Sequence, residues 1–428
     1  MGLEHVRVTT HCLVMNMKNN AARLLEDTLE KLNSLLFSLA NRTSPGYFSR
    51  DPKLLTFQNT ALMILNMIKK AIAVEVMIFF GHFPDAPKMP SRQAFTKARE
   101  KISYLAFKDF FDKSCELAAA GGEGTRTYKG YRLFASDGTS FFVGNLEIES
   151  LKEYFGESTT VEGRAMCRIG GIVDVLNECI INAKVSGFEI GERVLAIEQV
   201  KELKDVNNAL FLFDRGYWSQ ELVREICSNG QKFLMRLASN TGKTIVKNES
   251  GETLKLRRHS FLLPSGEVEI LLTNLSTEEV TDEELCWLYT KRWGVETKYL
   301  ELKDRLQIDS LSGESANIVL QDIYSTLYIS NLSAFLCFEA DEIIEEKTCD
   351  KDNKYPQKTN RSNCISLLRD RFIRICLLAT PMQRTLAMKR LVKDISSNVT
   401  YIGKSKSRHR NKRKIKEARR RTSSKPLL

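Results

Sequence analysis

The sequence predicts an α/β protein in which helical segments flank a mixed β-sheet. Five short apolar runs after residue 125 are rich in β-branched and aromatic residues, which is typical of strands. Helical patterns separate the later runs, so the expected order is β-β-β-α-β-α-β, and this order favours a partly parallel sheet covered by helices. The stretch before these runs carries apolar residues at helical spacing instead. The predicted strands are residues 132–143, 165–176, 178–188, 209–218 and 232–238, with helices at 191–203 and 219–230.

The N-terminal region is expected to be helical over residues 21–40, 60–80 and 89–115. In the third helix Ser91 is the expected N-cap. A basic face follows, formed by Arg92, Lys97, Arg99 and Lys101. This face is typical of a helix that meets DNA, and equally typical of the solvated face of a helical bundle.

Beyond the strands, residues 239–280 are predicted to form a small β insertion. A long helix is expected over residues 281–306, where Thr281 and Glu284 match a capping box. Two further helices are expected over residues 315–345 and 363–380.

The composition narrows the class of protein. A hydrophobic content of 43% and a charged content of 27% are typical of a soluble globular protein. No run reaches the ~18 apolar residues of a membrane helix, and the N-terminal sequence shows no signal-peptide pattern. The ten cysteines form no CxxC pair, so we expect a cytoplasmic protein with reduced thiols and no membrane partner. The five histidines lack metal-ligand spacing, so any catalytic metal has to be held mainly by carboxylates, which suit Mg²⁺ or Mn²⁺.

Positive charge is concentrated at the C-terminus. Residues 403–428 hold twelve Lys or Arg and one Glu, which equals the net charge of +11 of the whole chain, so residues 1–402 are balanced. Such a tail is typical of a disordered segment that binds a polyanion. A solvated basic tail without a specific role is the alternative.

Two aspartates follow apolar strands. Asp137 is expected to end the first strand, with Gly138 forming a tight turn, and Asp214 follows the apolar residues 211–213. In open α/β sheets ligands bind outside the carboxyl ends of strands, so these carboxylates are candidates for a shared cation site. Either aspartate alone is also typical of a residue that caps a turn.

The predicted long helix carries a charged stripe. Tyr289, Arg292, Glu296 and Lys303 follow a Y-x2-R-x3-E-x6-K spacing, and at ~100° per residue they fall within roughly 60° of one another. A charged stripe is normally solvated, but apolar residues border this one on both sides, which indicates partial burial.

This helix resembles the YREK signature of the DDE transposases of the insertion-sequence-4 type. SDGTSF (136–141) is similar to the first-Asp strand of that family, LFLFDRGYWS (210–219) to its second-Asp motif and FLMRL (233–237) to the next strand, and residues 312–332 resemble the segment beyond the helix. The motifs stand in the family's order. The predicted insertion is short for members that carry a large β insertion, so roles of the larger insertion are not transferred.

The resemblance implies an RNase H-like core in which Asp137, Asp214 and Glu296 are catalytic and hold two divalent ions, Mg²⁺ or Mn²⁺. One ion would activate a water or a DNA 3′-OH, and the other would stabilise the leaving oxygen. It also implies DNA contacts. The candidates for phosphate binding are Tyr289, Arg292, Lys303 and, less directly, Arg236. Trp293 is either a base-stacking residue or, more often for tryptophan, part of the core.

The expected function is DNA transposition: binding of the terminal inverted repeats of its own element, cleavage, and joining to target DNA, by a dimer associated with a bacterial nucleoid. The expected domains are 1–125 (helical, DNA ends), 126–238 with 281–340 (catalytic core), 239–280 (β insertion), 341–402 (helical, dimerisation) and 403–428 (basic tail). A nuclease that cuts without joining is one alternative. A repurposed protein that only binds DNA is another, although an intact triad speaks against decay.

Overall fold

The structure is a computed structural model that describes residues 19–48, 54–67, 69–83, 89–144, 148–158, 163–242, 244–262, 266–350 and 355–402. These residues belong to two compact units. The first unit contains residues 115–304, and the second joins residues 18–114 to the chain after residue 304. The predicted basic tail, residues 403–428, lies outside the described residues.

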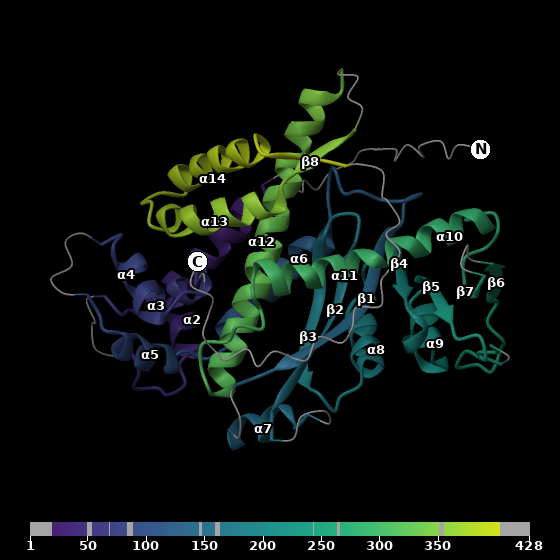
Figure 1. Ribbon diagram of the computed structural model, residues 1–428, viewed down its shortest axis with the longest axis horizontal. Coiled ribbons are helices and arrows are strands. Elements are labelled where there is room, and N and C mark those ends of the chain that lie inside the picture. The colour runs from purple at the N-terminus through teal and green to yellow at the C-terminus, as the bar shows by residue number, and fades with distance from the viewer. Residues whose placement is uncertain are drawn as a thin grey trace. The chain divides into compact units, whose positions relative to one another are not determined.

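A seven-stranded mixed sheet forms the centre of the first unit, in the order β3-β2-β1-β4-β5-β7-β6 (Figure 1). β2 is antiparallel to both β1 and β3, whereas β4 is parallel to β1 and β5 is parallel to β4. This topology confirms the predicted RNase H-like mixed sheet. The strands are β1 (Arg132–Phe142), β2 (Met166–Asp174), β3 (Cys179–Gly187), β4 (Ala209–Phe213), β5 (Lys232–Leu237), β6 (Arg257–Leu262) and β7 (Val268–Thr273).

Strands β6 and β7 come from the predicted insertion. β7 pairs antiparallel with β5, and β6 pairs antiparallel with β7. The insertion therefore extends the edge of the main sheet.

Two helices lie on opposite faces of this sheet, next to adjacent glycines of β2. Successive residues of a strand point to opposite faces. A Cβ atom at Gly170 would lie 3.0 Å from Leu195 of α8 (Glu192–Glu202), and one at Gly171 would lie 2.7 Å from the hydroxyl of Tyr299 in α11 (Trp293–Leu300). Because neither glycine has a side chain, both helices come close to the strand, α8 on one face and α11 on the other.

Two expected local structures in this unit are wrong. The predicted strand over residues 132–143 is confirmed, since β1 continues to Phe142, but the tight turn expected at Gly138 is wrong because this half of the strand remains paired with β2. The single helix expected over residues 281–306 is three segments: α10 (Asp282–Lys291), α11, and the π-helical η2 (Glu301–Arg305), with Arg292 at the first junction. The predicted capping box of Thr281 and Glu284 is confirmed. The other helical elements of the sheet domain are α7 (Glu149–Phe155), η1 (Arg215–Tyr217) and α9 (Gln220–Ser228).

The second unit is built around one long helix, α12 (Ala316–Thr348), whose residues are buried almost without interruption from Ile318 to Phe338. Helices from both ends of the chain pack against it. None of the described helices is long and apolar enough to cross a membrane. The other elements are α1 (Asn20–Asn33), α2 (Leu35–Ala40), α3 (Phe57–Leu65), α4 (Ile72–Phe80), α5 (Arg92–Glu100), α6 (Leu105–Ala120), β8 (Gln357–Thr359), α13 (Arg361–Cys376), α14 (Pro381–Ser396) and β9 (Val399–Tyr401).

The expected N-terminal helices are each divided in two. Ser34 interrupts the first, because its side chain accepts a hydrogen bond from the Phe37 amide and starts α2. The expected N-cap at Ser91 is confirmed for α5. Helix α14 was not predicted, although Thr380 and Pro381 begin it with a capping box and a proline in the first turn.

The basic face predicted for residues 89–115 is only partly exposed. Arg99 is 2% exposed, and its guanidinium donates hydrogen bonds to Asp322 at 3.0 Å and to Gln321 at 2.8 Å. Lys69 lies 3.7 Å from the same carboxylate. Burial raises the pKa of Asp322, but Arg99, Lys69 and Ser312 outweigh this and hold it well below its usual range. Arg99 is therefore part of the core, and the expectation that it faces DNA or solvent is wrong.

We predict that Asp322→Asn lowers the free energy of unfolding of the second unit by about 3–5 kcal/mol, because it removes the buried carboxylate that both Arg99 and Lys69 contact. Urea unfolding followed by circular dichroism measures this. The matched control is Asp112→Asn, which breaks the exposed Lys108–Asp112 pair in the same unit and should cost less than about 1 kcal/mol. Equal losses for the two variants would contradict the interpretation.

Candidate active site

Asp137 lies in the middle of β1, just past the point where β4 stops pairing. β4 pairs with β1 only from Arg132 to Ala135, whereas β2 continues alongside and sets Gly171 opposite Asp137. The Asp137 carboxylate accepts a hydrogen bond from the Gly138 amide at 2.8 Å. Burial raises the pKa of Asp137 to about 6. The charges of Glu192 and Asp214 add to this rise, while Arg292 and the Gly138 amide oppose it.

Asp214 follows the last residue of β4. Its carboxylate accepts a hydrogen bond from the Gly216 amide at 2.7 Å and caps η1. In the register that pairs Ala135 with Leu212, Asp137 and Asp214 both stand two residues further along their strands. The two aspartates therefore lie level with each other, just beyond the segment in which β1 and β4 pair, consistent with the effect of Asp214 on the pKa of Asp137.

Arg292 connects the helix to these strands. Its guanidinium donates to the Glu296 carboxylate at 2.8 Å, one turn further along, and the side chain is almost fully buried. Its charge also lowers the pKa of Asp137. The Glu296 side chain is 37% exposed. Arg292 thus acts on both the first and the third carboxylate of the predicted triad.

Tyr299 fixes α11 against the first strand. Its hydroxyl donates to the Asp137 main-chain carbonyl at 2.7 Å. This contact occurs over Gly171, where a side chain would collide with the tyrosine.

Tyr289 and Arg236 lie in a second group of polar residues around Arg292. Burial raises the pKa of Tyr289 to about 12, while the charges of Arg292 and Arg236 lower it and those of Glu269 and Asp214 raise it. The Arg236 guanidinium lies 3.5 Å from the Glu269 carboxylate. Arg236, a lesser candidate from the sequence, is therefore close enough to change the pKa of Tyr289, which the charge of Asp214 also affects.

The remaining two sequence-predicted residues differ in placement. Trp293 is 51% exposed, so the core role that we considered more frequent for it is wrong; the Arg292 guanidinium lies 5.0 Å from its ring centroid. Lys303 lies in the π-helical η2. Burial raises the pKa of the Cys167 thiol in β2, and the charge of Lys303 opposes this rise. Cys167 is four residues along β2 from Gly171, so Lys303 stands further along the sheet from Asp137 than the helical stripe suggested.

The sequence analysis missed Glu192 and its neighbours. Glu192 begins α8, and a Cβ atom at Gly138 would lie 2.4 Å from its carboxyl group. An open pocket of about 540 Å³ surrounds it, next to the turn that follows Asp214. Its lining residues are Arg168, Gly191, Glu192, Arg193, Val194 and Gly216. Glu192 is one of many acidic residues at helix starts, and its position depends on how β3 leads into α8, so no local pattern marks it.

The carboxylates have the donor chemistry of a hard cation site, since Mg²⁺ and Mn²⁺ prefer oxygen ligands. The mutual repulsion at Asp137 is of the kind that a cation relieves. In the described part of the chain, however, no three Asp, Glu, His or Cys side chains are already grouped closely enough to hold one ion. Asp137 and Asp214 follow the paired segments of two neighbouring strands, and Glu296 lies on α11 in an ion pair with Arg292.

We predict that Asp137→Asn stabilises the protein in EDTA at pH 8 and not at pH 4. A carboxyl whose pKa rises on folding favours the folded state only at low pH, and this contribution is lost as the pH rises through about 6. The rise from 3.8 to about 6 corresponds to about 3 kcal/mol, so we expect a gain of about 2–3 kcal/mol in urea unfolding at pH 8. The exposed Asp205→Asn is the control; the same gain for both variants, or at both pH values, would refute the prediction.

The chain was compared with known proteins. Residues 129–332, 204 of the 428 residues, match the family model of the transposase DDE domain, and the match includes Asp137, Asp214 and Glu296. The chain is similar to the cryo-EM structure of the piggyBac transposase synaptic complex with hairpin DNA, with a TM-score of 0.48 and 13% identity over 90% of this chain and 86% of that chain. No curated protein sequence matches the chain significantly. Residues 129–332 are therefore similar in sequence to the transposase DDE domain.

Proposed function

We propose that this protein is a DNA transposase of the insertion-sequence-4 type. It would bind the terminal inverted repeats of its own element, cleave phosphodiester bonds there and join the ends to target DNA. The observation that carries the proposal is the position of one buried arginine between two of the three carboxylates. Arg292 pairs with Glu296 at 2.8 Å and its charge lowers the pKa of Asp137, which stands level with Asp214 in the register of β1 and β4. All four residues lie within the segment that matches the transposase DDE domain.

Asp137, Asp214 and Glu296 are the residues that would hold two divalent ions, Mg²⁺ or Mn²⁺. Bound there, such ions would activate the attacking oxygen and stabilise the leaving oxygen of an in-line displacement. The protein's own contribution is positional. The strand pairing of β1 and Tyr299 fix the backbone at Asp137, the Gly216 amide orients Asp214, and Arg292 holds Glu296 on the facing helix.

Arg292 has a further role in this proposal. Its Nε is buried and makes no hydrogen bond to any described residue, so it is a donor that a phosphate oxygen would satisfy. Tyr289 and Arg236 stand beside it and would contact the same or the next phosphate. Exposed Trp293 would stack on a base, while Lys303 would contact the backbone at a greater distance from the cleaved bond.

Joining requires that two DNA ends be held together, so we propose a dimer on DNA. A nuclease on the same fold would give cut ends without joined products. A protein that only binds DNA would give neither product.

We predict that Glu296→Gln reduces cleavage and strand transfer at least about a thousandfold, or about 4 kcal/mol, because the loss of one anionic ligand weakens the stabilisation of the charge that develops in the transition state. The assay uses DNA that carries the element's own ends, with Mg²⁺ and then with EDTA. Glu283→Gln, an exposed residue of α10, is the matched control and should keep wild-type rates.

The outcomes separate the candidate functions. Joined products that need both the metal ion and Glu296 support the transposase. Cut but unjoined products indicate the nuclease, and tight binding without cleavage indicates a DNA-binding protein that no longer reacts.

A further inference from the structure

A second basic site lies in the second unit, on the helical pair α13 and α14. The two helices contain eight basic and two acidic residues, a net charge of +6. Residues 1–402 as a whole are neutral, so this pair is a local concentration of positive charge within the folded chain. Part of it serves the fold: Arg369 donates to the main-chain carbonyls of Leu65 and Met67, and Arg384 pairs with Glu26.

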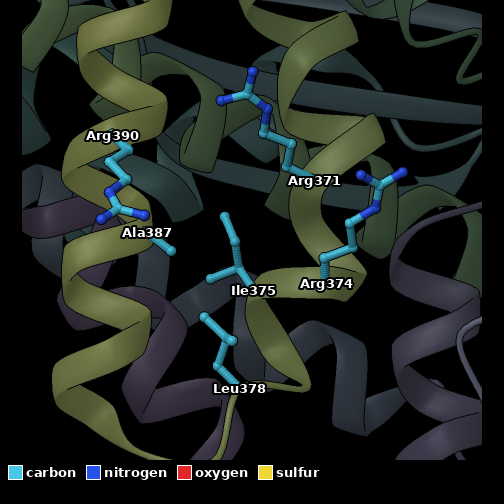
Figure 2. Close-up of a pocket in the computed structure, with 6 residues that line it drawn as sticks. All are labelled: Arg371, Arg374, Ile375, Leu378, Ala387 and Arg390. Carbon is cyan, nitrogen blue, oxygen red and sulfur yellow. The ribbon is translucent and has the colours of Figure 1, made fainter.

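Three of the remaining arginines surround a pocket of about 230 Å³. Arg371 and Arg374 come from α13, and Arg390 comes from the facing turns of α14 (Figure 2). Ile375, Leu378 and Ala387 form an apolar floor between the two helices. Two helices thus present three guanidinium groups around one small cavity.

The carboxylates nearby leave most of this charge available. Arg371 pairs with Asp394, but Arg374 is 3.9 Å from Asp370 and both of those side chains are more than 60% exposed, so this contact is weak. Arg390 is exposed and forms no ion pair with a described residue. Lys389 and Lys393 of α14 are exposed as well. Arginine forks with spare donors are suited to phosphate oxygens.

We propose that the cleft between α13 and α14 binds the phosphate backbone of DNA through residues other than those that cut it. That the ligand is DNA rests on the proposed function. The inference gives α13 and α14 a role in DNA binding, whereas the sequence predicted dimerisation for residues 341–402. The apolar floor offers no base-reading donors, so binding here is independent of sequence. Its role is to anchor the DNA that the carboxylate site cleaves.

The test is the double variant Arg374→Gln/Arg390→Gln in the full-length protein, which leaves the Arg371–Asp394 pair intact. The binding of a 30-base-pair duplex carrying an element end, and of one with arbitrary sequence, is measured by fluorescence anisotropy between 50 and 200 mM salt. Each lost phosphate contact lowers the slope of log K against log salt by about 0.9. We expect a slope lower by about 2 on both duplexes, so that the variant loses about tenfold less affinity than wild type over this range.

The control variant Arg23→Gln/Lys70→Gln removes two exposed charges that lie outside α13 and α14 in the second unit and should keep the wild-type slope. Ala387→Glu is the second variant: it leaves every arginine in place but adds a carboxylate to the pocket, and it should weaken binding to both duplexes. Circular dichroism verifies that all variants are folded.

An unchanged salt slope in the double variant overturns the inference. The oligomeric mass of the double variant without DNA is measured by light scattering. If this mass changes while the salt slope stays the same as in wild type, the cleft is an interface between copies of the chain and the inference is overturned. Cleavage by the wild type is assayed in parallel. If wild type cuts its ends but the variants bind normally, only this inference fails; if wild type neither binds nor cuts DNA, the proposed function fails first.

Discussion

The contact between Tyr299 and the main chain of Asp137 holds the candidate active site together. It requires that α11 lie directly on the strands, and this is possible only because Gly171 has no side chain at the point of contact. Once α11 lies there, Arg292 is carried to a buried position next to Asp137, and Glu296 follows one turn later. The adjacent Gly170 likewise lets α8 come close to β2 on the opposite face of the sheet, because it has no side chain there. Close packing of helix on sheet therefore determines where the charges stand.

Charge balance is the second constraint on this site. Asp137 is partly buried near two other carboxylates, and Arg292, the described cation that acts on it, is also engaged with Glu296. Paired charges of this kind are costly to bury and costly to separate. Any ligand that enters must therefore exchange partners with Arg292: a cation with the carboxylates, or a phosphate with the guanidinium. This makes the arginine, as much as the three acidic residues, a determinant of what the site accepts.

The sequence was sufficient for the class of fold and the order of strands, because apolar runs and intervening helical patterns depend on local periodicity. It was insufficient where contacts with another segment of the chain decide where a strand ends, where a helix breaks or which side chain is exposed. β1 continues past Asp137 because β2 lies beside it, although Asp-Gly-Thr reads as a turn. The long helix breaks at Arg292 and widens at η2, so an ideal helical wheel misplaced Lys303. Trp293 is exposed and Glu192 was missed for the same reason, since both positions depend on tertiary packing.

The discontinuous second unit has a consequence for biosynthesis. Arg99 is separated from Asp322 by 223 residues, and residues 115–304 of the first unit are encoded between them. At a translation rate of ~5–20 residues per second, the ribosome needs roughly 10–45 seconds to supply the counter-charge of Arg99. During that interval the sheet domain is synthesised, while the early helices still lack the α12 segment against which they pack. The sheet domain of the first unit is therefore synthesised before the second unit can complete its core. Until then the early helices of the second unit expose apolar surface, which favours aggregation.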